Sequence, residues 1–208
     1  MTVLEKRQPD LTIMAESVYK PHNLSAMLRS CDAVGIGRIL AVNPTGGVET
    51  FTTTSASAEK WVEVETYSAT DKALTHVEDQ GMQILAAHFS ERAVDYRSVD
   101  YCRPTCIVFG NEKDGVSTIA ARRADAHIII PMIGMVRSLN VSVATAVILF
   151  EAQRQRSISG HYASPKLDAV QRHEMAFEWL YPREALLCRE SGRAYPPLDE
   201  EGSIIRSE

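Results

Sequence analysis

The sequence predicts an α/β fold whose mostly parallel sheet is covered by helices on both faces. Short apolar or β-branched segments alternate with helical segments along most of the chain, which is the order expected of βαβ units. Such short segments with few polar residues are typical of strands that are buried on both sides. At 208 residues, with 45% hydrophobic and 24% charged side chains, the chain is long enough for one main domain with an extension.

Six segments are predicted as strands from their apolar and β-branched content: Leu11–Ala15, Arg38–Val42, Trp61–Thr66, Gln83–Phe89, Thr105–Phe109 and Ala126–Pro131. Three segments between them are predicted as helices: Leu24–Ala33, Asp71–Asp79 and Ser117–Ala124. Stop signals agree with these bounds, because Gly35 and Gly81 follow the first two helices and Pro131 ends the last strand. The order of elements therefore predicts parallel strands joined by crossover helices.

The last third of the chain is predicted to be largely helical. Val141–Arg156 is apolar almost all round at its start and ends in the letters QRQR, so we expect a helix that begins buried and emerges at its C-terminal end. After a linker-like stretch, a second helix is expected from Leu167 to Tyr181, and from Pro182 onward an irregular, partly mobile tail. We expect a main domain at residues 1–157 and a C-terminal helical extension with an acidic tail at residues 158–208.

Composition excludes several classes of protein. No apolar run reaches the about 18 residues that span a bilayer, and the first residues lack the apolar stretch of a secretory signal, so we expect a cytoplasmic protein with no membrane partner. Four scattered cysteines fit neither a disulfide framework nor a zinc site, and no metal is expected. The net charge is −5, but residues 151–173 carry four bases against two acids, which leaves room for a local basic patch.

Three segments are candidates for chemistry, because ligands in open α/β sheets bind at the carboxyl ends of strands. They are the helix that starts near Asn23, the loop Gly110–Gly115 and the loop Met132–Asn140. None of them has the glycine pattern of a dinucleotide or P-loop site, and no G-x-S-x-G elbow of a hydrolase occurs. What remains is a ligand held by backbone groups and apolar side chains, such as a neutral nucleoside derivative.

Each candidate also has a purely structural interpretation. Asn23 has the residue type of a helix N-cap, and so do Ser138 and Asn140 ahead of the buried helix. Arg29 lies three residues before Asp32, a spacing that ordinary surface ion pairs share. Glu112 and Lys113 have the character of turn residues. Taken singly the structural interpretation is favoured, but the joint occurrence of these residues in three segments favours a functional site.

The three segments together resemble the motifs of the SpoU (TrmH) branch of the SPOUT RNA methyltransferases. Asn23-x-Ser-Ala-x-x-Arg29-x-x-Asp-Ala-x-Gly35 resembles the first motif, and Val108-Phe-Gly-Asn-Glu-Lys-x-Gly-Val-Ser117 resembles the second. Ile130-Pro-Met-x-Gly-x-x-x-Ser-Leu-Asn-Val-Ser-x-Ala144 resembles the third. The motifs occur in the family's order, and the similarity spans about residues 7–156.

This resemblance implies a fold, an activity and partners. The fold is an α/β domain whose C-terminal part forms a deep trefoil knot, a topology that general rules of chain connection would not propose. The activity is 2′-O-methylation of a D-loop guanosine in tRNA, at position 18, with S-adenosylmethionine as methyl donor and with the enzyme acting as a homodimer. A 2′-O-methyltransferase for rRNA or for another tRNA position is the alternative.

The resemblance also implies the residues of the site. Catalytic roles fall to Asn23, Arg29, Glu112, Ser138 and Asn140. The cofactor would be held by Gly110, Ile130, Met132, Gly134, Ser138 and Leu139. RNA contacts are expected at Arg29, Arg154 and Arg156, the latter two in the basic stretch at residues 151–173.

Arg29 is difficult to accept as a general base, because a guanidinium has a pKa of about 12.5–13.8 and only donates hydrogen bonds. We therefore expect it to act as an electrostatic aid that holds a phosphate and favours the developing alkoxide, with water or the phosphate taking the proton. The sequence leaves two other classes of protein as alternatives, namely a non-catalytic RNA-binding module and a nucleotide-dependent oxidoreductase. The five catalytic candidates argue against the first, and the missing glycine fingerprint argues against the second.

Overall fold

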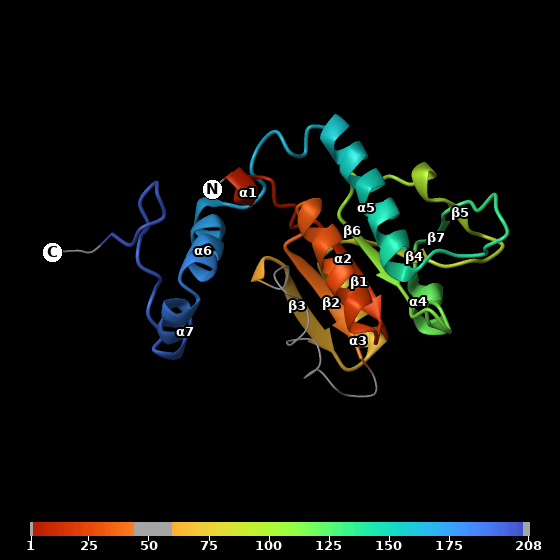
Figure 1. Ribbon diagram of the computed structural model, residues 1–208, viewed down its shortest axis with the longest axis horizontal. Coiled ribbons are helices and arrows are strands. Elements are labelled where there is room, and N and C mark those ends of the chain that lie inside the picture. The colour runs from red at the N-terminus through yellow and green to blue at the C-terminus, as the bar shows by residue number, and fades with distance from the viewer. Residues whose placement is uncertain (1, 44–59, 206–208) are drawn as a thin grey trace. The chain divides into compact units, whose positions relative to one another are not determined.

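The computed structural model describes residues 2–43 and 60–205, and the chain divides into two compact units (Figure 1). The larger unit is Gln8–His161, and the smaller one is Met1–Arg7 together with Tyr162–Glu208. The first seven residues thus belong with the C-terminal unit, which the expected boundary after residue 157 did not anticipate. Each unit is described by itself below.

The larger unit is built on a seven-stranded sheet with the order β3-β2-β1-β6-β4-β7-β5. The strands are β1 (Leu11–Glu16), β2 (Arg38–Val42), β3 (Glu63–Tyr67), β4 (Gln83–Ala87), β5 (Val94–Asp95), β6 (Thr105–Phe109) and β7 (Ala126–Ile129). Every neighbouring pair is parallel. The prediction of a mostly parallel α/β sheet is therefore confirmed, and the two-residue β5 is the strand that the sequence did not indicate.

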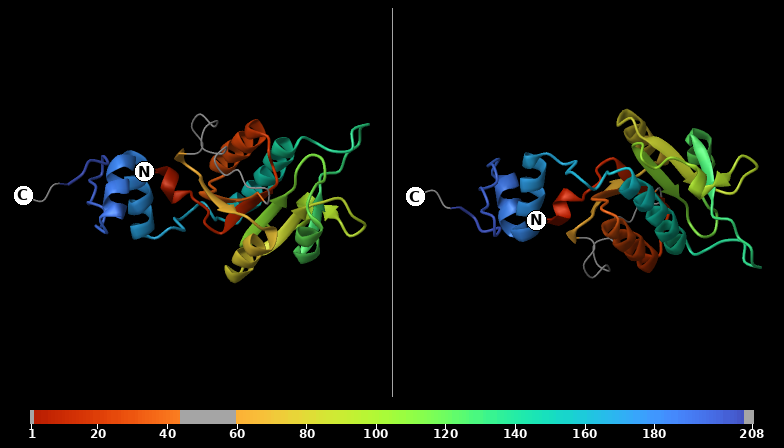
Figure 2. Two further views of the ribbon diagram at one scale, coloured as in Figure 1. Left: turned by 90° about the horizontal axis from the view of Figure 1, so that it is seen from below. Right: turned by 90° about the horizontal axis from the view of Figure 1, so that it is seen from above.

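Helices cover both faces of this sheet, as predicted. They are α2 (Pro21–Ala33), α3 (Thr70–Asp79), α4 (Thr118–Arg123), α5 (Val141–Ile158) and the short 3-10 helix η3 (Tyr96–Ser98). Along β1, Ile13 packs in the cluster that contains residues of α2 and α5, whereas Met14 packs in the cluster that contains residues of α3 and α4. Because successive strand residues point to opposite faces, the two helix pairs lie on opposite sides of the sheet (Figure 2).

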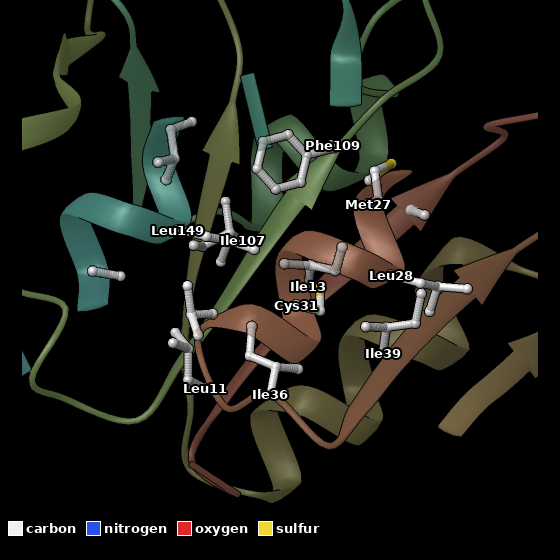
Figure 3. Packing of buried hydrophobic residues seen from close by; sticks show 14 of the residues in the cluster. Leu11, Ile13, Met27, Leu28, Cys31, Ile36, Ile39, Ile107, Phe109 and Leu149 are labelled. Atoms are coloured by element: carbon white, nitrogen blue, oxygen red, sulfur yellow. The ribbon is translucent and has the colours of Figure 1, made fainter. Parts of the chain in front are cut away.

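The core between the sheet and the pair α2/α5 is the larger of the two clusters. Met27, Leu28 and Cys31 of α2 pack with Ile107 of β6 and Leu149 of α5, all fully buried (Figure 3). α2 and α5 also contact each other directly. This packing fixes the start of both helices at the carboxyl edge of the sheet, which is where the candidate site residues lie.

Helix α5 begins at Val141, as predicted, but its C-terminal end does not emerge into solvent on all sides. Arg154 is exposed, while Arg156 has no exposed surface at all. The two-residue spacing places the side chains on different sides of the helix. The start of α5 was expected to be buried and is so on one side only, since Val143 is 47% exposed. The prediction for the basic end was also correct only in part.

The smaller unit contains α1 (Thr2–Glu5), α6 (Ala169–Leu180) and α7 (Pro182–Glu190). α6 starts with a capping box in which Asp168 and Gln171 exchange hydrogen bonds. Phe177, on its buried face, stacks on Tyr195 with ring centroids 4.8 Å apart.

The irregular tail expected from Pro182 was wrong, because residues 182–190 form α7. Proline is well suited to the first turn of a helix, where its missing N–H would have no partner in the helix. Pro182 therefore starts α7 rather than ending the helical region. Beyond the helix, an antiparallel bridge between Leu198 and Ile204 gives the following segment some regular structure.

Candidate functional site

Asn23 lies inside the first turn of α2 and does not cap it. The helix starts at Pro21 with Lys20 in the N-cap position, so the N-cap interpretation of Asn23 is wrong. Its side chain is buried and instead joins two other loops. The Asn23 Nδ2 donates a hydrogen bond to Oε1 of Glu112, and its Oδ1 accepts one from Nδ2 of Asn140 over 3.1 Å.

Asn140 continues this chain of hydrogen bonds into α5. Its Oδ1 accepts from the backbone N–H of Ser142 at 2.8 Å and from the Ser142 hydroxyl at 2.6 Å, so that Asn140 is the N-cap of α5. At the other end, Lys20 Nζ lies 3.5 Å from Oε1 of Glu112. The chain from Ser142 through Asn140 and Asn23 to Glu112 therefore connects all three sequence motifs at one edge of the sheet.

The loop that carries Glu112 is folded tightly on itself. Asn111 bridges to Gly115, and the Asn111 side chain accepts hydrogen bonds from the backbone N–H groups of Lys113 and Asp114. A Cβ on Gly110 would overlap the backbone of Gly115 and of the residue after it. Glycine is thus required at position 110 by the close approach of the loop's own backbone.

The loop that follows β7 presents backbone and apolar side chains to solvent. Ile133 and Met135 are fully exposed, Ser138 is exposed, and Met132 and Leu139 are half-buried. Within the described part of the chain, backbone N–H and C=O groups of residues 132–139 make no hydrogen bonds. Free amides and apolar side chains are the chemistry that a nucleoside with a methionine chain requires, so the residues fit S-adenosylmethionine.

The remaining cofactor candidates differ in their surroundings. Ile130 is half-buried and packs against the core under α2 and α5. Gly134 has open space where a Cβ would stand, so no steric constraint from this chain requires glycine there. Gly110, Ile130 and Gly134 all follow the carboxyl ends of β6 or β7, the edge at which the hydrogen-bonded chain also lies.

Arg29 is exposed on α2, and among the described residues it makes no hydrogen bond or ion pair. The pair with Asp32, which its spacing suggested, is not formed. Arg29 is six residues from Asn23, which is about 9 Å along a helix axis, and no contact joins the two. The structure therefore brings Asn23, Glu112 and Asn140 together, and leaves Arg29 as an exposed cation beyond them. Ser138 makes no hydrogen bond with residues 2–43 or 60–205 either.

Arg156 was expected to contact RNA, and its position contradicts that expectation. The guanidinium is fully buried and its five donors are all used. They bind the carbonyls of Tyr101, Asp10 and Arg103, Oδ1 of Asp10 and Oε1 of Gln8, at 2.7–3.1 Å. Arg156 thus fastens the end of α5 to the segments before β1 and β6 and is not available to a phosphate.

Arg154 is on the other side of α5 with its side chain 57% exposed. It forms a two-point ion pair with Glu151, one helical turn earlier, at 2.7 and 2.8 Å. Pairing with Arg154 is the first cause of a lowered pKa at Glu151. Of the two arginines at the end of α5, only Arg154 is placed to meet a ligand from solvent.

Glu16, at the carboxyl end of β1, is a site residue that sequence reasoning missed. It is buried, and its two oxygens accept hydrogen bonds from the Thr70 hydroxyl at 2.6 Å and from the backbone N–H of Ser117 at 2.8 Å. Through Ser117 it fixes the end of the loop that carries Glu112. The sequence signal that could have identified Glu16 is a carboxylate at the end of an otherwise apolar strand.

Other kinds of site find little support. Among residues 2–43 and 60–205, no cluster of His, Cys, Asp and Glu could hold a metal ion, and no helix there is long and apolar enough to cross a membrane. The four cysteines are free. Burial raises the pKa of Cys106 to about 12, so this thiol stays protonated and is a poor nucleophile.

Comparison with known proteins gives consistent matches. The SpoU rRNA Methylase family matches residues 10–150, and the C-terminal SpoU rRNA methylase family matches residues 154–207. A tRNA (guanosine(18)-2′-O)-methyltransferase of Escherichia coli strain K12 is 47% identical over 204 residues, which cover 97% of this chain and 89% of the relative.

Solved structures agree. The Aquifex aeolicus TrmH/SpoU tRNA modifying enzyme matches with a TM-score of 0.80 and 41% identity, over 87% of this chain and 92% of the other. An AdoMet-bound rRNA methyltransferase from Sinorhizobium meliloti matches with a TM-score of 0.62 and 30% identity, over 74% and 59% of the two chains. With its motifs joined at one edge of a parallel sheet and both family regions matched along its length, the chain belongs to the SpoU methylase family.

Proposed function

We propose that this chain methylates the ribose 2′-oxygen of guanosine 18 in the D-loop of tRNA, with S-adenosylmethionine as methyl donor. The observation that carries the proposal is the hydrogen-bonded chain through Asn140, Asn23 and Glu112. It connects three motifs of an RNA methyltransferase at the edge where open α/β sheets bind ligands. The 47% identity to the Escherichia coli enzyme for guanosine 18 supports the choice of substrate.

Different side chains of the site position the methyl donor and the ribose. S-adenosylmethionine, when bound, supplies an electrophilic methyl group on a sulfonium. Glu112 is held by Asn23 through Oε1, while no hydrogen bond within the described residues engages its Oε2. Oε2 therefore accepts a hydrogen bond from a ribose hydroxyl or from the ammonium group of the methyl donor. Fixed groups of this kind align the reactants before the reaction, which lowers the entropic part of the barrier to the displacement.

Arg29 acts on the RNA side. Its exposed guanidinium holds the phosphate beside the target ribose and stabilises negative charge that develops on the 2′-oxygen. It takes no proton, because a guanidinium with a pKa of about 12.5–13.8 is already protonated. The ribose proton passes to water or to a phosphate oxygen.

The methyl donor would be held by the loops that follow β6 and β7. Backbone groups near Gly110, Gly134 and Ser138 would bind its polar atoms, and Ile130, Met132 and Leu139 would contact its apolar parts. The support is the free backbone of residues 132–139 together with the exposed apolar side chains of that loop. Asn140 holds this loop to Asn23 and so couples the cofactor side of the site to Glu112.

The arrangement of the polypeptide and of its copies is also part of the proposal. The family resemblance and the TM-score of 0.80 to the Aquifex aeolicus enzyme support a trefoil knot formed around the β7–α5 loop. A homodimer would cover Val143 and Phe150 of α5, which are about half exposed. A monomeric mass in solution at micromolar concentration would contradict the dimer. A tRNA substrate implies a cytoplasmic location.

Methylation of rRNA is the second candidate, and a specific observation favours it. The family matched over residues 10–150 is described as rRNA methylases, and one structural relative is an rRNA methyltransferase. The test is transfer of labelled methyl from S-adenosylmethionine to an unmodified tRNA transcript, to the same transcript with guanosine 18 replaced by adenosine, and to rRNA. Label in the first transcript alone supports the proposal, whereas label in rRNA alone supports the alternative.

A further inference from the structure

A pocket lies beside α4, on the side of the sheet that α3 and α4 cover. It has a volume of about 380 Å³ and is lined by His88, Arg92, Val116, Thr118, Ala121, Arg122 and His127. Val116 packs in the cluster of α3 and α4, while Ile128, the residue after His127, packs in the cluster of α2 and α5. By the alternation of strand side chains, His127 points to the side of the sheet on which α4 lies.

The lining of this pocket is basic. It contains two arginines, two histidines and a threonine hydroxyl, and no carboxylate. Of the acids near these residues, Glu78 binds Arg123 and Asp125 accepts a hydrogen bond from the backbone of Ile84, whereas Glu91, next to Arg92 in the chain, is exposed. In a chain of net charge −5, such a concentration of donors without an acid indicates a site for an anion.

Two of the basic groups are fixed by the fold. The His127 ring has the Ser90 hydroxyl 2.7 Å from Nδ1 and Nη2 of Arg92 2.6 Å from Nε2. Nη2 of Arg92 also donates to the carbonyl of Ala121 at 2.7 Å. The guanidinium is therefore held in place, and its Nη1 makes no hydrogen bond with described residues and can bind a ligand. A donor that is already positioned loses little entropy when it binds an anion.

The other two groups line the pocket without such ties. Arg122 is exposed and makes no hydrogen bond or ion pair among the described residues. His88 packs edge-on against His127 with ring centroids 5.0 Å apart. Burial lowers the pKa of His88, and the charges of His127 and Arg92 lower it further, so near pH 7 its ring is a neutral donor. The permanent charge of the pocket comes from the two arginines.

We propose that this pocket binds a phosphate group, namely a phosphodiester of the tRNA outside the methylated nucleotide. The choice of RNA as the source rests on the proposed function, whereas the choice of phosphate rests on the lining. Arginine forks match the geometry of phosphate oxygens and bind them strongly. Pockets of about 300–1,000 Å³ hold small ligands, so the pocket has room for a phosphate with an attached sugar. Val116 in the pocket and Glu112 in the methyl-transfer site belong to one loop, which links the two sites.

The test uses Arg122→Gln, with Arg122→Glu as a second variant and Lys72→Gln as the control. Lys72 is exposed on α3, which covers the same face of the sheet, and makes no ion pair among the described residues. The dissociation constant of a labelled tRNA transcript is measured at 50 and 200 mM salt, together with thermal unfolding and with calorimetry of S-adenosylmethionine. The loss of one phosphate contact reduces the slope of log affinity against log salt concentration by about 0.7–0.9. The factor by which Arg122→Gln weakens tRNA binding should therefore be about threefold larger at 50 mM than at 200 mM salt.

A second arm separates the sources of phosphate. Ribose 5-phosphate is titrated into wild-type protein and Arg122→Gln by calorimetry. If tRNA binding is unchanged but ribose 5-phosphate binds only to the wild type, the pocket takes a phosphate from a small molecule and the RNA part is overturned. If neither ligand distinguishes the variants, or if Lys72→Gln weakens tRNA as Arg122→Gln does, the phosphate site is overturned. Failure of the wild type to methylate tRNA would refute the proposed function, and the ribose 5-phosphate arm would still decide the pocket.

Discussion

Replacing Arg156 by alanine should destabilise the larger unit without acting on RNA directly. The side chain is fully buried, and its loss removes five hydrogen bonds, one of them to the carboxylate of Asp10. Breaking a buried ion pair costs about 3–5 kcal/mol. The Asp10 side chain is 27% exposed and can be partly hydrated, so we expect the lower end, about 3 kcal/mol. For total stabilities of about 5–15 kcal/mol, this is a large fraction.

The assay is urea unfolding followed by tryptophan fluorescence. The chain has two tryptophans, Trp61 in the larger unit and Trp179 in the smaller one. A Trp179→Phe background leaves Trp61 to report on the larger unit alone. With a slope of about 2 kcal/mol per molar urea, Arg156→Ala should lower the midpoint by about 1.5 M.

Arg154→Ala is the matched control, since Arg154 is on the exposed side of the same helix. Ion pairs at such positions contribute little to stability, so the midpoint of this variant should stay near that of the wild type. Below its unfolding transition, Arg156→Ala should keep the salt dependence of tRNA binding. A wild-type midpoint together with weaker, less salt-dependent binding of tRNA would refute the reasoning and make Arg156 an RNA contact.

Three further changes test the site. Arg29→Ala should abolish methyl transfer and leave the affinity for S-adenosylmethionine nearly unchanged by calorimetry, because its proposed partner is the RNA; near-normal turnover would remove Arg29 from the mechanism. Gly110→Ala places a Cβ against the backbone of Gly115, so it should weaken cofactor binding and lower the unfolding temperature, whereas Gly134→Ala should leave that temperature unchanged. Arg154→Ala should flatten the salt dependence of tRNA affinity by about 0.7–0.9, and an unchanged slope would argue against a phosphate contact there.

The sheet was predictable because its strands carry strong local signals. Arg38–Val42 and Thr105–Phe109 were predicted with the bounds that the structure has, since runs of apolar and β-branched residues leave few other conformations. Val94–Asp95 was not predicted, because a two-residue edge strand depends on its partner β7 rather than on its own sequence. The same holds for the strand order, which is decided by packing between distant segments.

The errors at the ends of α5 and α6 have a common origin. A proline was taken as a stop signal at Pro182, where it starts α7, and a basic residue was taken as exposed at Arg156, where it is buried. Both inferences assign a residue its commonest role. Whether a proline ends one helix or begins the next depends on which helix face the rest of the fold can cover. An arginine can be buried only where carbonyls and a carboxylate converge on it. Neither condition is visible from neighbours in the sequence.

The sequence indicates the edge of the sheet at which Asn23, Glu112 and Asn140 lie, but not the hydrogen bonds that join them. Parallel strands bring the loops after β1, β6 and β7 to one edge, so residues 89 and 117 positions from Asn23 were expected to meet there. The sequence could not show that α2 begins before Asn23, a shift of one turn that turns a supposed cap into the centre of the chain. Because Asn23 donates to one partner and accepts from the other, an aspartate there would lose the bond to Glu112 and a leucine would lose both. An amide satisfies both neighbours, because it donates one hydrogen bond and accepts the other. These two hydrogen bonds are enough to explain why position 23 is an asparagine.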